Sequence, residues 1–382
     1  MRYRPIYNED HESFRESVRE FLNREVWPNV DDFAASRGVT RELWLAAGKQ
    51  GYLGLEVAEQ YGGSAAGDYR FNTVLIEELA AVNMALASLM SIHFDVVAPY
   101  LVNLTTQEQR ERWLPGFVAG EIVTAIGMTE PSAGSDLAAL RTTAQRRGEG
   151  WVLNGSKTFI TNGYSADLVV VAARTTPGSR SRGITLFAVE SSMPGFSRGR
   201  KLDKVGQPEA DTAELFFDDL RVPGENVIGT LDQGFVHMMD GLPQERLGSA
   251  VANLAHARQI LAETVTYAKE RHAFGAPIGS FQHNKFLLAD LATRADVTQA
   301  YIDQCVLAHV RGELSAVDAA KAKWWSAQVQ NDILDHCVQV HGGYGYMTER
   351  RVARAWRDAR VTKIWAGSNE IMKELIGRDL GL

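Results

Sequence analysis

Cysteine, runs of one charge and long apolar stretches are all scarce in this chain of 382 residues. Its two cysteines, Cys305 and Cys337, have no CxxC partner, which argues against a disulfide framework and against a thiolate zinc site. Lys and Arg together number 40 and Asp and Glu 47, so the formal net charge is −7. Because it has no basic run, the chain is a poor candidate for binding nucleic acid or an anionic membrane surface.

Membrane and export signals are also missing from the sequence. Clean apolar stretches such as Met84–Met90 fall far short of the roughly 18–20 residues that a membrane span needs. The segment Met1–Asp10 has no apolar signal core and soon turns acidic. We therefore expect no membrane span, and we expect a reduced, cytoplasmic enzyme.

The common nucleotide, metal and hydrolase motifs do not fit. Gly155–Thr158 lacks the Gly-Lys pair of a phosphate loop, and Gly343–Gly345 is too short for a dinucleotide fingerprint. No Gly-x-Ser-x-Gly elbow occurs, which argues against an α/β-hydrolase. The offsets of His336, Cys337 and His341 do not place all three on one helical face, so we expect no metal site.

The hydrophobic pattern divides the chain into three blocks. Residues 1–124 have the pattern of helices, residues 125–232 that of a small β-domain whose strands close on one another, and residues 233–382 that of long antiparallel helices. The expected class is a multidomain α+β protein. A domain held between two helical ones creates a cleft, which suits a large cofactor.

Apolar spacing and caps locate the individual elements. An amphipathic helix is predicted over His11–Val26, and Thr106 with Gln109 forms a capping box for a short helix that ends before Pro115. Long helices are predicted over 235–271, from a Ser280 cap to 310, and over 316–340. The β-rich runs are Trp151–Ser156, which leads into a turn, Lys157–Ile160, Leu168–Ala172, Ile184–Val189, Ala213–Phe217 and Leu220–Val222.

Four polar segments each have an ordinary and a functional interpretation. Ala125–Asp136 combines glycines, a proline and hydroxyls, which suits a heteroaromatic ring and equally an interdomain loop. The neighbours Glu245 and Arg246 are either a solvated pair on a helix or part of a site. Arg271–Ile278 and Gln339–Gly343 contain the glycines that end helices, and glycines beside polar donors also suit a pyrophosphate.

Together and in this order, these motifs resemble those of the acyl-CoA dehydrogenase family over essentially the whole chain. The segments that carry the resemblance are Met128–Asp136, Asn154–Gly163, Arg271–Ile278, Gln339–Gly343 and Gly367–Glu370. The resemblance implies bound FAD, an N-terminal helical domain, a middle β-barrel-like domain and a C-terminal four-helix-type bundle. It also implies a homo-oligomer, usually a homotetramer.

The position of the catalytic carboxylate distinguishes branches of that family. In most members it lies directly before a Gly-Thr late in the chain, where this sequence has Ala366, which cannot accept a proton. The long-chain and isovaleryl branches instead carry the base on a long helix, in a segment that resembles Leu242–Arg246. Further segments that resemble the long-chain branch are Arg200–Leu202, Asp211–Phe217 and Glu370–Ile376. The resemblance therefore implies Glu245 as the base.

The same resemblance assigns binding residues. Those expected at the flavin are Ile126, Met128, Thr129, Gly134, Ser135, Phe159, Ile160, Thr161, Ser368 and Glu370. Phe159 replaces a frequent tryptophan, which keeps the ring packing and loses an N–H donor. Residues expected at the FAD of a neighbouring subunit are Arg271, Phe274, Gln282, Gln339, Gly342 and Gly343. Residues expected at the thioester and CoA are Ser135, Ser181, Arg182, Arg246, Ala366 and Gly367.

The implied reaction is α,β-dehydrogenation of an acyl thioester. A desolvated base takes the α-proton, donors such as the Ala366 amide stabilise the enolate oxygen, and the flavin accepts the β-hydrogen as hydride. The expected partners are acyl-CoA, an electron-transfer flavoprotein or similar acceptor, and further copies of this chain. The small residues Gly248–Ala250, which follow Glu245, favour a medium-to-long or branched acyl group.

Three alternatives remain open from the sequence. The thioester could belong to an acyl-carrier protein of secondary metabolism, with the same chemistry and a carrier protein in place of CoA. A flavin monooxygenase or N-hydroxylase on this fold would need no α-proton base, so Glu245 argues against it. A catalytically inactive scaffold would explain Ala366 only if Glu245 were not available.

Overall fold

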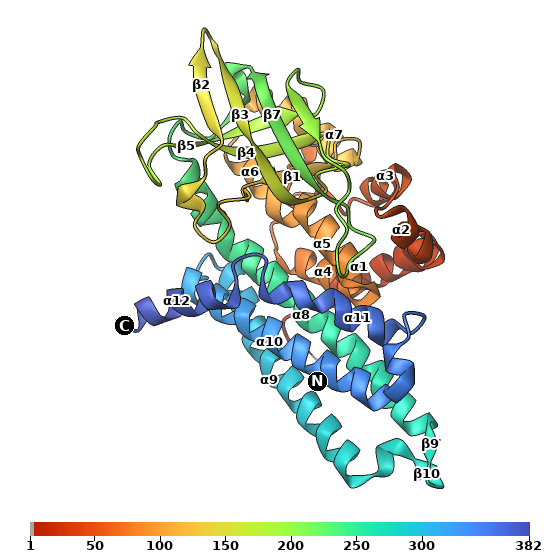
Figure 1. The fold of residues 1–382 in the computed structure, drawn as a ribbon. Coiled ribbons are helices and arrows are strands. Elements are labelled where there is room, and N and C mark those ends of the chain that lie inside the picture. The colour runs from red at the N-terminus through yellow and green to blue at the C-terminus, as the bar shows by residue number, and fades with distance from the viewer. Residues whose placement is uncertain (1–3) are drawn as a thin grey trace.

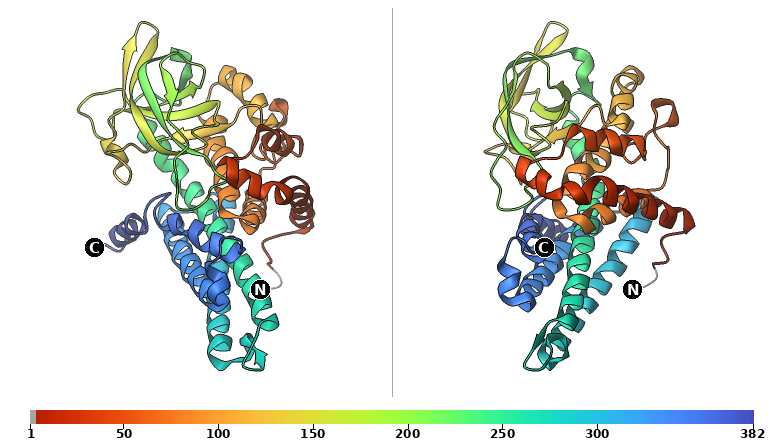
Figure 2. Two further views of the ribbon diagram at one scale, coloured as in Figure 1. Left: turned by 45° about the vertical axis from the view of Figure 1, so that its right-hand side comes forward. Right: turned by 90° about the vertical axis from the view of Figure 1, so that its right-hand side faces the viewer.

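A computed structural model describes residues 4–382 as two helical parts with a β-sheet part between them in sequence (Figure 1). The sheet lies at one end of the molecule, and the long C-terminal helices extend to the other end (Figure 2). The helix α8 (Gly234–Glu270) runs from beside the sheet into the C-terminal bundle. A residue near the start of α8 therefore lies close to all three parts.

The N-terminal part consists of short helices, as the sequence predicts. They are α1 (Glu9–Phe21), α2 (Val30–Ser36), α3 (Arg41–Lys49), α4 (Arg70–Val82), α5 (Met84–Ser91), α6 (Ala98–Asn103) and α7 (Gln107–Ala119). The predicted helix over 11–26 is α1 continued by a π-helical turn, Leu22–Val26. The capping box of Thr106 and Gln109 at α7 is confirmed.

The prediction that Pro115 follows α7 is wrong, because Pro115 lies inside this helix. A proline there lacks the N–H that would bond the carbonyl of Glu111. Both residues are exposed, so water can satisfy that carbonyl, and the helix continues to Ala119.

The sheet has eight strands in the path β6-β7-β3-β2-β4-β5-β8, with β1 paired to β4. Their bounds are β1 (Thr124–Gly127), β2 (Thr143–Arg147), β3 (Gly150–Thr161), β4 (Leu168–Arg174), β5 (Ile184–Glu190), β6 (Phe196–Arg198), β7 (Thr212–Val222) and β8 (Val227–Ile228). β4 and β5 are buried along almost their whole length, which explains their continuous apolar sequences.

Three details of the sheet differ from the prediction. The expected turn after Ser156 does not interrupt β3, since register shifts between Leu153 and Gly155 and between Lys157 and Ile160 absorb it as bulges. The two short runs over 213–222 form one strand, β7. The polar strand β2 was not predicted because only one of its five residues is buried.

The C-terminal part contains the three predicted long helices: α8, α9 (Gln282–Val310) and α10 (Ala316–His341). They pack on one another, and the shorter helices α11 (Arg351–Ala359) and α12 (Asn369–Asp379) pack on α10. A small hairpin, β9 (His272–Ala273) with β10 (Ala276–Pro277), lies between α8 and α9. Ser280 does not cap α9; its hydroxyl donates to the Pro277 carbonyl at 2.6 Å, and Phe281 takes the capping position.

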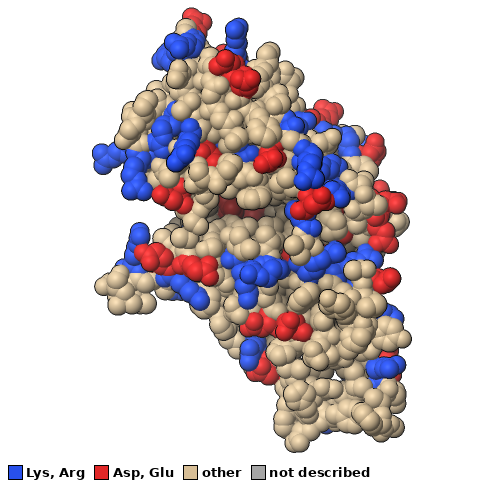
Figure 3. All heavy atoms as spheres, viewed as in Figure 1, with Lys and Arg blue, Asp and Glu red and all other residues tan. Residues whose placement is uncertain are grey.

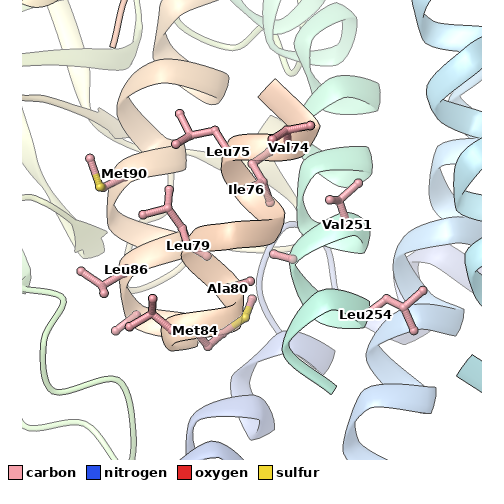
Figure 4. Packing of buried hydrophobic residues seen from close by; sticks show 14 of the residues in the cluster. Val74, Leu75, Ile76, Leu79, Ala80, Met84, Leu86, Met90, Val251 and Leu254 are labelled. Carbon is pink, nitrogen blue, oxygen red and sulfur yellow. The ribbon is translucent and has the colours of Figure 1, made fainter. Parts of the chain in front are cut away.

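The main core joins the N-terminal helices to the bundle. Apolar side chains of α4 and α5, among them Ile76 and Leu79, pack against α8, which contributes Val251 (Figure 4). Helical structure continues from Met84 to Asn103, a 20-residue run that is longer than the apolar stretch the sequence suggests and whose most apolar 18-residue window has a mean hydropathy of 1.5. Its most apolar window is 72% buried inside the protein, as in a core helix.

Candidate active site

The loop after β1 is fixed to β3 by a buried ion pair. Lys157 Nζ lies 2.8 Å from Glu130 Oε1, and it donates to the Met128 carbonyl at 3.3 Å. The Thr158 amide donates to the Thr129 carbonyl at 3.0 Å. The predicted flavin residues of the loop and of β3 are therefore held side by side.

The last residues of β3 present their side chains in different directions. Phe159 is 69% exposed and has a φ of 59°, which is rare for a bulky residue and marks a conformation imposed by its surroundings. The side chain of Ile160 is buried in the core of the sheet part, so it is not available to a ligand. Ile126, Met128, Thr129 and Thr161 are half-buried, and Gly134 and Ser135 are exposed.

Glu245 lies in α8, two residues after a proline inside the helix. Burial raises the pKa of its carboxyl, and the charges of Arg246 and Lys323 oppose that shift. Lys323 comes from α10 and is fully buried, which lowers its pKa to about 7. A desolvated carboxyl with a raised pKa has the properties of a general base.

A short turn before α12 faces the same region. Ala366 has a φ of 50° and Gly367 a φ of 88°, and Lys323 Nζ donates to the Gly367 carbonyl at 2.5 Å. Ser368 caps α12 by accepting from the Ile371 amide at 3.3 Å, and Glu370 is exposed in the first turn of the helix. The buried lysine thus ties the turn of residues 366–368 to the helices around Glu245.

Two features of this region suit a polar ligand, namely a hollow in the surface and an unsatisfied donor on the residue after Glu245. The surface is hollowed between the sheet part and the C-terminal bundle (Figure 3). Arg246 is 7% exposed, and its Nε has no hydrogen-bond partner within residues 4–382. Its guanidinium lies close to Gly367. An unsatisfied buried donor fits a cofactor or substrate that supplies an acceptor.

The predicted substrate residues of the sheet part also come together. Ser181 is half-buried and Arg182 exposed, in the loop between β4 and β5. An ion pair of 3.2 Å between Arg180 and Asp136 joins this loop to the segment that carries Ser135. The two loops therefore form one polar margin of the site.

The residues predicted to bind a neighbouring subunit's FAD lie elsewhere. Arg271, Gly342 and Gly343 line a cleft of about 520 Å³ at the far end of the bundle. A Cβ at either glycine would meet no atom within 4 Å, so both backbones are open. Phe274, Gln282 and Gln339 are exposed near this end of the bundle and do not line the cleft.

Beside the base the structure places two carboxyls that the sequence did not reveal, one buried (Asp95) and one half-buried (Glu56). Glu56, from the loop after α3, and Asp95, from a π-helical turn over residues 92–97, are bridged by the amides of Gln244 and Asn72. Burial is the largest cause that raises the pKa of each carboxyl to about 7. Since the partners are far apart in sequence, no local pattern could indicate them.

The sequence suggested that Gly248 leaves space for an acyl chain, but the structure shows that it does not. A Cβ there would lie 2.3 Å from Asp95 Oδ2, so this glycine lets the carboxylate approach α8. Lys323 could have been found from sequence, since it stands among the buried positions Ala319, Ala322 and Ser326 of α10. Burying a charge on the apolar face of a helix costs free energy unless the charge is paired and hydrogen-bonded, so a lysine at such a position indicates a specific partner.

Family models match almost the whole chain. They are the acyl-CoA dehydrogenase N-terminal domain over residues 8–121, middle domain over 125–220 and C-terminal domain over 232–381. The mouse mitochondrial long-chain specific acyl-CoA dehydrogenase is 46% identical over 379 residues, 99% of this chain and 88% of the mouse protein.

Solved structures agree with the sequence comparison. An acyl-CoA dehydrogenase from Geobacillus kaustophilus is 42% identical with a TM-score of 0.98, covering 100% of both chains. A glutaryl-CoA dehydrogenase from Mycobacterium smegmatis in complex with FADH2 is 26% identical with a TM-score of 0.91, covering 98% of this chain and 95% of that one. The chain therefore belongs to the acyl-CoA dehydrogenase family of FAD-dependent oxidoreductases.

Proposed function

We propose that this chain oxidises an acyl-CoA to the trans-2-enoyl thioester and that Glu245 is the base. The proposal rests on a comparison of the two positions, 366 and 245, at which the family carries its catalytic carboxylate. Position 366 holds an alanine, whereas Glu245 in α8 has its pKa raised by burial. Abstraction of a weakly acidic α-proton needs such a desolvated carboxylate within hydrogen-bond reach.

Other side chains of the site hold the thioester and its charge. The Ala366 amide, in the turn held by Lys323, is the proposed donor to the carbonyl oxygen as enolate charge develops. Arg246 Nε supplies an unsatisfied donor in the same region. Bound FAD supplies the acceptor for the β-hydrogen. Phe159, exposed near the end of β3, is proposed to pack on the flavin, with Thr129, Ser135 and Thr161 as polar contacts.

The proposed substrate is a medium-to-long or branched acyl-CoA. Support comes from the 46% identity to the long-chain mouse enzyme, whereas the small residues after Glu245 no longer support it. The joined loops at Ser135 and Ser181 are proposed to bind the CoA arm, together with Arg182. The electron acceptor is proposed to be an electron-transfer flavoprotein.

A homo-oligomer, proposed to be a tetramer, would complete the FAD site. Arg271 follows Glu245 by roughly 26 positions of α8, or about 39 Å at 1.5 Å per residue. A dinucleotide bound at Glu245 would not span this distance within one chain, which supports the proposal that the cleft at Arg271 serves a cofactor held by another copy. Large apolar side chains are exposed near that end, including Phe274 at 98% and Tyr346 at 76%. Such exposure is typical of surfaces that a partner covers.

The substitution Glu245→Gln tests the base directly. Loss of a positioned general base slows the reaction by roughly 10²–10⁴-fold. We expect the variant to retain FAD and bind acyl-CoA, and to reduce its flavin slowly in a single-turnover stopped-flow experiment. The matched control is Asp240→Asn, which neutralises an exposed carboxylate of the same helix and should leave the rate unchanged. Reduction of Glu245→Gln at the wild-type rate would refute the assignment.

The same enzyme preparation separates the alternative substrates. Product formed on a carrier protein and none on CoA, measured by mass spectrometry, would favour the carrier-protein thioester. Oxygenated product would favour a monooxygenase, and a colourless purified protein would favour a scaffold.

A further inference from the structure

The carboxyls of Glu56 and Asp95 are held together by shared donors. The Gln244 side-chain nitrogen lies 3.2 Å from Glu56 Oε1 and 3.3 Å from Asp95 Oδ1. The Asn72 side-chain nitrogen lies 3.3 Å and 3.4 Å from the same two oxygens. Two carboxyls gathered around common donors away from water do not both ionise readily, because their like charges repel.

This pair adjoins the helix of the base at two points. Gln244, the residue that bridges the two carboxyls, directly precedes Glu245 in α8. Gln244 also donates to the Asp95 backbone carbonyl at 3.0 Å. One turn further along α8, Asp95 Oδ2 lies over Gly248, where a Cβ would come within 2.3 Å of it. The π-helical turn over 92–97 places Asp95 there, and such turns are frequent at functional sites.

Among residues 4–382, no cation forms an ion pair with Asp95. Glu56 faces it from the loop after α3, Glu245 faces it from α8, and Tyr69 faces it from the start of α4. The ring of His309, from α9, lies against Tyr69. The cations Arg246 and Lys323 act on Glu245. Any negative charge on the pair is therefore felt by Glu245.

We propose that Glu56 and Asp95 form a carboxyl pair with one shared proton, which sets the pH range in which Glu245 acts as a base. They are positioning residues, because neither is placed in contact with the reacting atoms. The inference rests on the proposed role of Glu245. The pair carries one negative charge, and the closer this charge lies to Glu245, the more it opposes the ionisation of Glu245.

Two isosteric substitutions should move the pH profile in opposite directions. Asp95→Asn leaves the charge only on Glu56, and of the two carboxyls it is Asp95 that interacts with Glu245, so Glu245 should ionise at lower pH. Glu56→Gln leaves it only on Asp95, beside Gly248, so Glu245 should ionise at higher pH. The measurement is the flavin-reduction rate of FAD-loaded enzyme against pH in stopped flow. We expect midpoint shifts of about half a pH unit or more, of opposite sign.

An infrared titration gives a readout that does not depend on activity. The wild-type protein should show protonated carboxyl C=O absorption that disappears near neutral pH, and the part of this absorption that comes from the pair should be lost or shifted in both variants but retained in Glu209→Gln. The matched control is Glu209→Gln, because Glu209 is also buried, with a pKa raised to about 7 by burial, and faces Asp358. Its pH–rate profile should coincide with that of the wild type.

The outcomes separate this inference from the proposed function. If Asp95→Asn and Glu56→Gln lower the rate equally at every pH without moving the midpoint, the pair is only structural. If both midpoints move in the same direction, the shared-proton arrangement is wrong. If Glu245→Gln retains the wild-type rate, the base assignment itself fails, whatever the infrared titration of the pair shows.

Discussion

The ion pair between Lys157 and Glu130 gives a quantitative test of how the cofactor loop is held. The Lys157 side chain is 0% exposed and that of Glu130 is 4% exposed. Removing one partner of a buried pair typically costs about 3–5 kcal/mol, because the other charge is left uncompensated. Glu130 would keep two backbone donors, the amides of Arg141 at 2.6 Å and Thr142 at 2.9 Å. We therefore expect Lys157→Met to lower the free energy of unfolding by about 3 kcal/mol, near the lower end of this range.

The loss of stability caused by Lys157→Met should be smaller at low pH than at high pH. In the wild type, Lys157 is the main favourable cause that keeps the pKa of Glu130 below its usual value, against the effect of burial. Without the lysine, burial dominates and the folded-state pKa of Glu130 rises above its unfolded value. The folded variant then holds a proton that its unfolded state has released. Its stability is thus higher at low pH and is lost as pH rises through the new pKa.

Urea unfolding at pH 5 and pH 8, with FAD content measured on the same samples, checks this prediction. Lys157→Met should be less destabilising at pH 5 and should lose FAD, since the Met128 carbonyl loses its donor. The double variant Glu130→Gln/Lys157→Met should recover much of the stability, because it removes both charges. Equal losses at the two pH values, or a double variant no more stable than the single one, would refute the reasoning.

Two further substitutions test the packing of the base helix and the far cleft. Gly248→Ala would force its Cβ against Asp95 Oδ2, 2.3 Å away, and should destabilise the protein by roughly 1–3 kcal/mol and slow flavin reduction. Gly377→Ala in α12, where a Cβ meets nothing within 4 Å, is its control and should not destabilise. Arg271→Ala should lower FAD occupancy and the fraction of assembled oligomer in sedimentation velocity, since Arg271 lines the cleft with Gly342 and Gly343. Full occupancy in a monomeric wild-type protein would contradict that role.

The sequence by itself determined the elements whose signals are local. Apolar periodicity and end signals located the long helices α8, α9 and α10 within one or two residues. The capping box at Thr106 and Gln109 needed only a short segment, because both partners are three residues apart. The ordered motifs likewise indicated the acyl-CoA dehydrogenase family and its fold. Where an exposed carbonyl could turn to water, as at Pro115, the local rule failed.

Only the tertiary structure decided which polar groups surround Glu245. Asp95 reaches α8 because Gly248 has no side chain and because a π-helical turn aims it there. Glu56 and Lys323 arrive from segments that lie far from Glu245 in sequence. The energy of a buried charge depends on distance and on the exclusion of water, and both are properties of the packed chain. The sequence could indicate the base, whereas its protonation is governed by neighbours that only folding brings together.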